Sequence, residues 1–201
     1  MPPKRKFSRE EIILKALEIA SDKGMNALTS RELATALGST ASPIFTAFKN
    51  MDEVKNEVRN AALAQFNKSA QKARHFTPVF KQVGLQMIFF AIEQPKLYKI
   101  LFMSEKKESQ TFDDVFANLG EMGDLCIEVI QKDYDLSFDD AMLLFKHTWT
   151  FTYGIGALIA SGMCKFTENE IQDMLSSDFV AMLSLIKSGK AGKCTTLPKR
   201  N

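Results

Sequence analysis

The stretch "TSRELATALGSTASPIFTAFKNMDEV", residues 29–54, is rich in helix-forming residues, yet glycine and proline interrupt it twice. Gly38 predicts the end of a helix over about residues 30–37, because glycine readily takes the left-handed conformation that follows a helix. Pro43 fits only in a first helical turn, so a short helix to Phe48 is expected to begin at Ser42 as N-cap. Two short helices around a tight turn indicate a helix-turn-helix, the plan of many DNA-binding proteins. The spacing alone is a weak signal, since any pair of helices joined by a turn resembles it.

Helix starts are marked by capping boxes, in which Ser, Thr or Asn is followed three residues later by Glu. The pairs are Ser8 with Glu11, Thr29 with Glu32, Asn50 with Glu53 and Thr167 with Glu170. Since no alternating strand pattern appears, the sequence predicts an all-α fold of about nine helices. We expect them over about residues 9–24, 30–37, 42–48, 51–75, 79–93, 96–103, 112–134, 137–162 and 168–187, with Gly120 and Gly123 weakening the seventh.

The composition narrows the functional classes. A chain of 201 residues can hold a small domain joined to a larger one. Its net charge of +2 creates no global field toward nucleic acid, although Lys4, Arg5 and Lys6 make the first residues basic. Cysteines 126, 164 and 194 are far apart and form neither a CxxC pair nor a disulfide framework. Without a signal peptide, this pattern predicts a cytoplasmic protein.

Two other classes have little support. The run "HTWTFTYGIGALIASGMC", residues 147–164, lacks Asp, Glu, Lys and Arg, but it is short for a membrane span and carries His, hydroxyls and glycines. We interpret it as a buried helix and expect no membrane partner. The sequence shows no glycine-rich phosphate loop, no nucleophile elbow and no metal-ligand spacing. We therefore predict no enzyme, no catalytic or metal site and no cofactor.

The stretch "ALEIASDKGMNALTSRELATALGSTASPIFTAFKNMDEV", residues 16–54, resembles the N-terminal domain of the tetracycline-repressor (TetR) family of bacterial transcription regulators. The likeness lies in the Lys-Gly turn, "LTSRELA", the aromatic Phe45 and the "FKNMDEV" entry to a long helix. The segment "HTWTFTYGIGALIASG", residues 147–162, is similar to the penultimate helix of many members. The resemblance implies a DNA-binding domain over residues 1–50 and an effector-binding and dimerisation domain over residues 51–201.

The resemblance also implies a homodimer on a palindromic operator in double-stranded DNA, acting as a repressor that a small-molecule effector releases. The residues that it places at the DNA are Lys4, Arg5, Lys6, Thr29, Arg31, Thr40, Ala41, Ser42, Pro43, Phe45, Thr46 and Lys49. Of these, the arm, Arg31 and Lys49 would meet phosphate or the minor groove, while the start of the second short helix would read bases.

The chain departs from the family pattern at several of these positions. Phe45 stands where the family usually has Tyr, so a hydroxyl that could bond phosphate is missing. Met51 replaces a frequent Lys, and Ala41 and Pro43 offer no hydrogen bonds to base edges. The departures leave an alternative open, an all-α ligand-binding or oligomerisation module whose degenerate helix-turn-helix does not read DNA.

Small residues indicate a place for a second copy. Gly154, Ala157 and Ser161 share one helix face with Leu158 beside them, a spacing that allows another helix to approach closely. Packing within the same chain is the alternative. The last helix would supply the other half of a four-helix interface through an apolar stripe. The stripe residues that we assign to the dimer interface are Ile171, Leu175, Phe179, Met182 and Leu183.

A ligand pocket is expected among aromatic residues of the second domain, because such pockets are mostly apolar with a few polar groups. The candidates are Phe89, Phe90, Phe102, Phe116, Trp149 and Tyr153, with His147 and Tyr153 able to orient a polar group. Packing in the core is the alternative for each of them. The pattern favours a small apolar or amphipathic effector.

Overall fold

The computed structural model describes residues 7–71, 79–104, 111–117 and 119–191, and all regular structure in these ranges is helical. The α-helices are α1 (Arg9–Lys23), α2 (Ser30–Ala36), α3 (Ser42–Ala47), α4 (Met51–Gln71), α5 (Val79–Glu93), α6 (Pro95–Phe102), α7 (Phe112–Ala117), α8 (Glu121–Tyr134), α9 (Phe138–Ser161) and α10 (Glu168–Lys187), with a short 3₁₀ helix at Met25–Ala27. The predicted all-α fold is confirmed. The end of the predicted fourth helix, residues 72–75, lies outside the described residues.

The predicted helix over residues 112–134 is in fact two helices, α7 and α8, and this raises the count above nine. Gly120 is the N-cap of α8, and its φ of 53° is a conformation that glycine adopts more readily than other residues. Gly123, in the first turn of α8, lets the Phe116 ring of α7 pack closely, since a Cβ there would lie 3.1 Å from that ring. Glycine marks a boundary here, where the sequence analysis expected only a weak point.

Local capping fixes most of the helix starts. The boxes at Ser8 and Thr167 are complete. In each, the cap side chain accepts a hydrogen bond from the amide of the Glu three residues later, and that Glu carboxylate accepts one from the amide of the cap residue. Thr29 accepts a hydrogen bond from the amide of Glu32 at 3.2 Å, but the Glu32 carboxylate pairs with Lys23. The Asn50 side chain likewise accepts from the amide of Glu53 at 2.9 Å. Each of these caps gives a partner to an amide that has no acceptor within its helix.

The start of α3 differs from the prediction. Ser42 is the first residue of α3 and does not cap it, because Ala41 already has helical angles of φ −73° and ψ −14°. The carbonyl of Ala41 accepts from the amides of Ile44 and Phe45, so the turn begins one residue earlier than expected. Pro43 remains in the first turn, as the sequence predicts.

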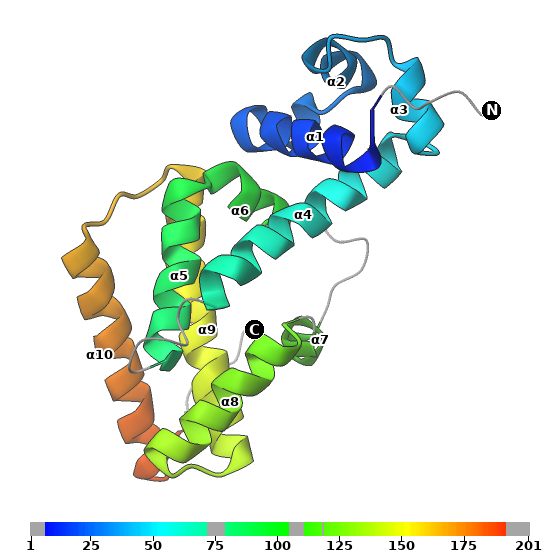
Figure 1. Ribbon diagram of the computed structural model, residues 1–201. Helices are drawn as coiled ribbons and strands as arrows, with labels where there is room; N and C mark the ends of the chain where they lie inside the picture. The colour runs from blue at the N-terminus through cyan, green and yellow to red at the C-terminus, as the bar shows by residue number, and fades with distance from the viewer. Residues whose placement is uncertain (1–6, 72–78, 105–110, 118, 192–201) are drawn as a thin grey trace, which may run out of the picture.

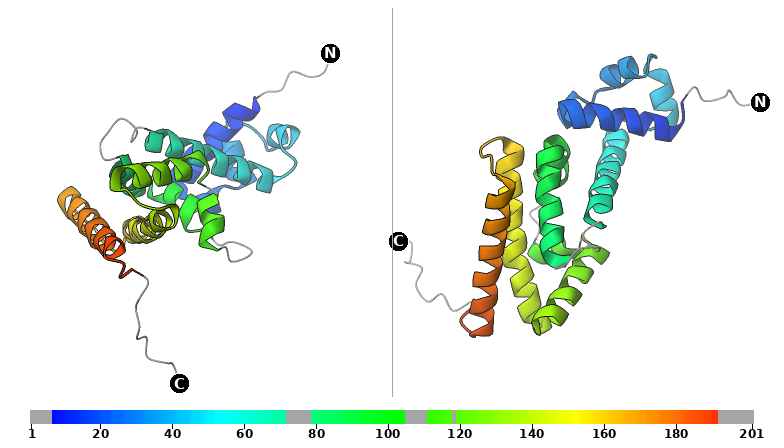
Figure 2. Two further views of the ribbon diagram at one scale, coloured as in Figure 1. Left: turned by 90° about the horizontal axis from the view of Figure 1, so that it is seen from below. Right: turned by 60° about the vertical axis from the view of Figure 1, so that its left-hand side comes forward.

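The helices form a small three-helix end and a larger bundle, joined by α4 (Figure 1). Helices α1, α2 and α3 gather at one end of α4, and α5 lies beside α9 in the bundle. Helix α10 runs along α9 at the edge away from α4 (Figure 2). No described helix is both long and apolar enough to cross a membrane.

One buried cluster connects the three-helix end to the bundle. It contains Leu33 and Ile44 at the small end, Val58 and Phe66 along α4, and Tyr98 of α6. Helix α6 packs against both α1 and α9, and the Ser21 hydroxyl of α1 donates to the Gln94 amide oxygen at 2.7 Å. The orientation of the small end therefore depends on α4 and α6 together.

Candidate nucleic-acid interface and ligand cavity

Helix α3 buries one face and exposes the other. Ile44 is 0% and Phe48 is 2% exposed, and these two side chains hold the helix end in the core. Ser42 and Thr46 are exposed on the opposite face, and the Phe45 ring is 48% exposed between them. A short helix held from one side in this way presents its free face to a partner.

The turn before α3 is closed by glycine, as the sequence predicts. Gly38 has φ of 59°, and its amide donates to the Thr35 carbonyl at 3.0 Å. The amide of Ser39 reaches back to the Ala34 carbonyl at 2.9 Å. A residue with a Cβ is strained at such a φ, so the tight approach of α2 to α3 needs glycine here.

The polar residues predicted to face DNA differ in how free their side chains are. Thr29 accepts a bond as the cap of α2, and Thr46 donates its hydroxyl proton to the Ser42 carbonyl at 3.0 Å. Arg31, Thr40 and Lys49 have exposed side chains. The predicted basic arm, Lys4 to Lys6, lies outside the described residues.

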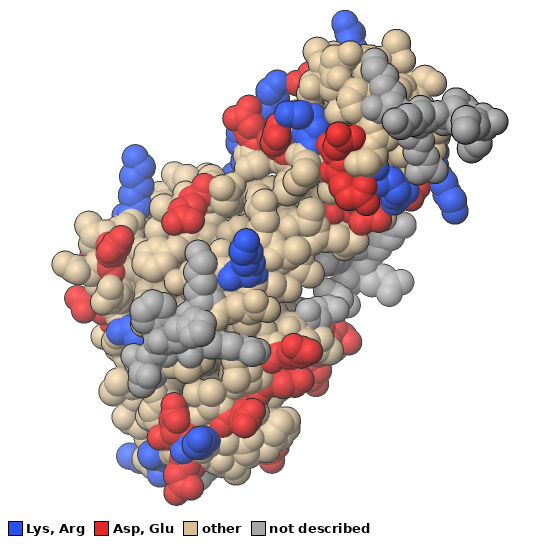
Figure 3. All heavy atoms as spheres, viewed as in Figure 1, with Lys and Arg blue, Asp and Glu red and all other residues tan. Residues whose placement is uncertain are grey.

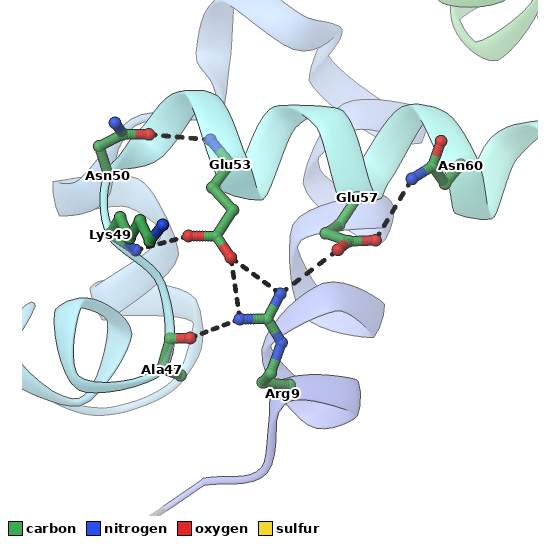
Figure 4. A network of polar contacts seen from close by, with 7 residues as sticks. All are labelled: Arg9, Ala47, Lys49, Asn50, Glu53, Glu57 and Asn60. Atoms are coloured by element: carbon green, nitrogen blue, oxygen red, sulfur yellow. Dashed lines mark hydrogen bonds and ion pairs between the residues drawn. The ribbon is translucent and has the colours of Figure 1, made fainter.

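Arg9, which the sequence analysis did not select, holds α3 and α4 together (Figure 4). One guanidinium nitrogen donates to the Ala47 carbonyl at 2.6 Å, and both reach one Glu53 oxygen at 3.0 Å. The second nitrogen also lies 3.3 Å from Glu57, and the guanidinium carbon stands 4.1 Å from the centre of the Phe48 ring. A single side chain of α1 thus fixes the end of α3 on the start of α4.

Glu53 is the centre of this network. Its second carboxylate oxygen accepts from the amide of Lys49 at 2.6 Å. This backbone bond and then the Arg9 side chain hold the pKa of Glu53 below its ordinary value. The signal in the sequence was the arginine itself, because a basic residue in the first turn opposes the helix dipole unless it has another partner.

The predicted ligand residues are spread over several parts of the bundle. Phe90 and Phe102 both pack edge-on against Phe66, with ring centres 5.5 and 5.2 Å apart, and Tyr153 donates to the Phe102 carbonyl at 2.8 Å. The remaining candidates lie elsewhere: Phe116 and Trp149 contact Phe145, Phe89 packs near Ile88 and Ile155, and His147 is exposed on α9. Of the predicted ligand residues, the structure therefore brings Phe90, Phe102 and Tyr153 together, and the other candidates lie apart from them.

A cavity of about 310 Å³ lies between α5, α9 and α10, and none of the predicted ligand residues lines it. Its apolar walls include Phe80, Leu175, Phe179 and Leu183, and its charged residues are Lys81 and Asp178. The sequence offered one signal for Asp178, which is an acid at the same helical spacing as the buried residues Ile171 and Met182.

The comparisons with known proteins concern the fold. No family model matches the sequence, and no curated protein matches it significantly. A TetR-like transcriptional regulator from Rhodococcus sp. RHA1 has a similar structure, with a TM-score of 0.56 over 92% of this chain and 96% of that chain, at 14% sequence identity. The chain has a TetR-like fold. The resemblance of residues 16–54 is thereby confirmed for the architecture.

In this TetR-like fold, the outer side of α9 carries the small residues predicted for the dimer. A Cβ on Gly154 would meet no atom within 4 Å, while Ala157 and Leu158 are half-buried and Ser161 is exposed. An open groove of about 600 Å³ runs along α9 and α10 past Gly154. At Gly154, therefore, this face has room for a side chain from another helix.

The predicted dimer residues on α10 lie differently. Ile171 is 0% and Met182 is 9% exposed, so the chain itself already covers both side chains. Leu175, Phe179 and Leu183 line the cavity. On this side of α10 the stripe packs within the protomer, because α10 lies directly on α9 and α5.

A row of acidic side chains lies along α7 and α8, at the end of the bundle away from α3, although acidic groups also lie at the three-helix end (Figure 3). On α7 and α8 they are Asp113, Asp114, Glu121, Asp124, Glu128 and Asp133. A polyanion is repelled by such a surface, so this end is unsuited to nucleic acid.

Proposed function

We propose that the protein is a sequence-specific DNA-binding transcription regulator, acting in the cytoplasm as a homodimer that a small apolar or amphipathic effector releases from a palindromic operator. Residues 1–50 form the DNA-binding domain in this proposal, and residues 51–201 bind the effector and the second copy. The exposed face of α3, with Ser42, Phe45 and Thr46 above a buried face, is the observation that carries it. Such a helix can enter a major groove with its first turn toward the bases.

The contacts are expected to divide between affinity and specificity. Arg31, Lys49 and the basic arm meet phosphate or the minor groove, and Thr29 bonds phosphate beside them. Thr40 to Pro43 and Thr46 lie toward the bases. Because the hydroxyl proton of Thr46 is engaged with Ser42, its base contact comes from the methyl group and the oxygen lone pairs. Phe45 offers an apolar surface to thymine methyl groups.

Two variants separate these roles. Lys49→Ala is expected to weaken binding to operator and unrelated DNA alike, and to reduce the log–log salt slope by about one unit. Thr46→Ala is expected to cost about 1 kcal/mol or less on the operator and little elsewhere. Salt titrations of both variants on selected and unrelated DNA measure the difference. If the two variants exchange these behaviours, α3 is not the reading helix.

The second candidate is a binding or oligomerisation module that does not read DNA. Ala41 and Pro43 favour it, since neither side chain can hydrogen-bond a base. Selection of fragments from random DNA by the wild-type protein decides between the two. A protein that retains no preferred sequence is the module and not the regulator.

The homodimer is proposed to form through the outer faces of α9 and α10. Gly154→Leu is expected to raise the dimer dissociation constant by at least about tenfold, because a bulky side chain separates closely packed helices. Lys132→Leu, which adds a leucine to an exposed position on α8, is the control and is expected to leave dimerisation unchanged. Sedimentation at micromolar concentration measures both, and a monomeric wild type contradicts the proposal.

Effector and operator binding are coupled in this proposal. Helix α4 begins beside the Arg9 network and ends in the bundle, so a change at either end can reach the other. An effector that prefers the DNA-free conformation weakens DNA binding by the same factor by which DNA weakens effector binding.

A further inference from the structure

Asp178, which lines the cavity between α5, α9 and α10, carries an oxygen atom that the described residues leave without a partner. Oxygen Oδ2 of Asp178 is buried and has no hydrogen-bond partner among the described residues. A buried acceptor without a partner costs free energy, so such an atom calls for a donor from outside the chain.

Four other polar side chains of the cavity have partners within the chain. The Lys81 ammonium donates to the Ser176 hydroxyl at 3.0 Å, and Ser176 donates in turn to the Gln172 carbonyl at 2.6 Å. The hydroxyls of Thr148 and Thr152 donate to carbonyls of their own helix at 2.8 and 2.7 Å. Asp178 is therefore the site where a ligand gains most from a polar contact.

Each helix next to Asp178 contributes charged or titratable side chains near it. Lys81 of α5 and Tyr134 of α8 line the same cavity, and Lys146 and His147 of α9 line the groove on the other side of Asp178. Burial raises the pKa of Asp178, and the charge of His147 opposes that rise. The effect of burial on the pKa is larger than that of the nearby positive charge. The negative charge of the carboxylate is therefore not fully balanced by its neighbours.

The size and walls of the cavity limit the rest of the ligand. Apolar cavities of about 150 Å³ hold one benzene ring, so a cavity of about 310 Å³ suits about two fused rings. The Phe80 and Phe179 rings are tilted by 46° to each other with centres 5.8 Å apart, and the centre of the Tyr134 ring lies 4.9 Å from that of Phe179. Aromatic walls of this kind bind flat apolar rings and, through their faces, an adjacent cation.

We propose that this cavity binds a small apolar amine of about two rings, whose charged nitrogen pairs with the Asp178 carboxylate. This inference rests on the proposed function, since it names the chemical class and the site of the effector. Asp178 also borders the outer groove along α9 and α10, so an occupant of the cavity would lie directly behind the proposed dimer face.

The test uses the full-length protein without DNA and three probes of one shape: naphthylethylamine, the neutral naphthylethanol and the anionic naphthylacetate. Calorimetric titration is expected to give a Kd of about 0.1–1 mM for the amine, the range for a ligand of this size. Asp178→Asn keeps the shape and removes the charge. It is expected to raise the Kd of the amine about tenfold and that of the alcohol less than about twofold.

A second variant tests the cavity without touching Asp178. Gly84→Ala adds a methyl group to the wall at an ordinary 3.5 Å from the Thr152 hydroxyl, in a helix where alanine is favoured. It is expected to weaken amine binding severalfold while the protein stays folded.

Three results overturn the proposal. They are an amine Kd unchanged in both variants, tighter binding of naphthylacetate, which makes Lys81 the anchor, and no saturable binding of the amine. Because no DNA is present, each of these results leaves the salt-titration test of DNA binding unaffected. Failure of that test, in turn, does not alter the binding of the probes.

Discussion

Gly156→Ala is expected to destabilise the protein by about 1–3 kcal/mol, the usual cost of overpacking a core. A Cβ at this position would stand 2.7 Å from Cζ of Tyr98 and would overlap its hydroxyl group. Tyr98 is 0% exposed and donates to the Tyr153 carbonyl at 3.2 Å, so its ring has no room to move aside. Helix propensity alone predicts the opposite sign, since alanine in a helix interior is favoured over glycine by about 1 kcal/mol.

Gly84→Ala, in the interior of α5, is the control. Its Cβ would lie at an ordinary 3.5 Å from the Thr152 hydroxyl oxygen, so helix propensity dominates and stability is expected to stay level or rise by up to about 1 kcal/mol. Urea unfolding of both variants at one protein concentration measures the contrast. Equal stabilisation in the two variants would show that α6 does not press on α9 at this point.

Tyr98→Phe completes the experiment as a double-mutant cycle. Removing the hydroxyl takes away the atom nearest to the new methyl group, so Gly156→Ala should cost less in the Tyr98→Phe background. The destabilisation by Gly156→Ala is expected to fall only in part, because the Cζ ring carbon remains close to the new methyl group. The cycle assigns the effect to this one contact between α6 and α9.

The close approach at Gly156 bears on function because of what α6 connects. One side of α6 packs on α1, where Ser21 donates to Gln94, and the other side packs on α9. Helix α9 carries the proposed dimer face around Gly154. Because packed interiors are poorly compressible, we expect this joint to carry displacement between α1 and α9.

The sequence predicted best what local chemistry decides. Capping at Ser8 and Thr167, the glycine turn at Gly38 and the stop at Gly162 depend on residues within a few positions, and the structure has each of them. The predicted single helix over residues 112–134 failed at Gly120, because a glycine in a helical pattern can weaken a helix or end it. Only the packing of Phe116 against Gly123 selects the second outcome.

The sites were harder to predict, because their positions depend on how helices cross. Asp178 lies beside apolar residues in the sequence, but its burial requires α10 to lie on α9 and α5. The same crossing covers Ile171 and Met182, which periodicity alone could assign either to a partner or to the core. The role of Arg9 was not predicted for a similar reason, since its acceptors are 38 to 48 residues away in the chain.

Arg9→Ala is expected to lower operator affinity by about tenfold, the size of one lost base contact, although Arg9 itself is not proposed to touch DNA. Its guanidinium joins the carbonyl end of α3, the Glu53 carboxylate and the Phe48 ring, so α3 loses its attachment to α4. A recognition helix that is free to tilt must be ordered at the cost of binding free energy.

Two further variants identify the cause. Arg9→Lys keeps the positive charge but cannot reach its several acceptors with a planar fork, so it is expected to bind operator nearly as weakly as Arg9→Ala. Arg59→Ala removes an exposed arginine of α4 that donates to the Asn56 side chain at 3.0 Å, and it is expected to leave operator preference intact. Fluorescence anisotropy on operator and unrelated DNA measures all three variants. If Arg9→Lys restores full affinity, charge at the DNA surface is what matters, and the role of Arg9 in positioning α3 is excluded.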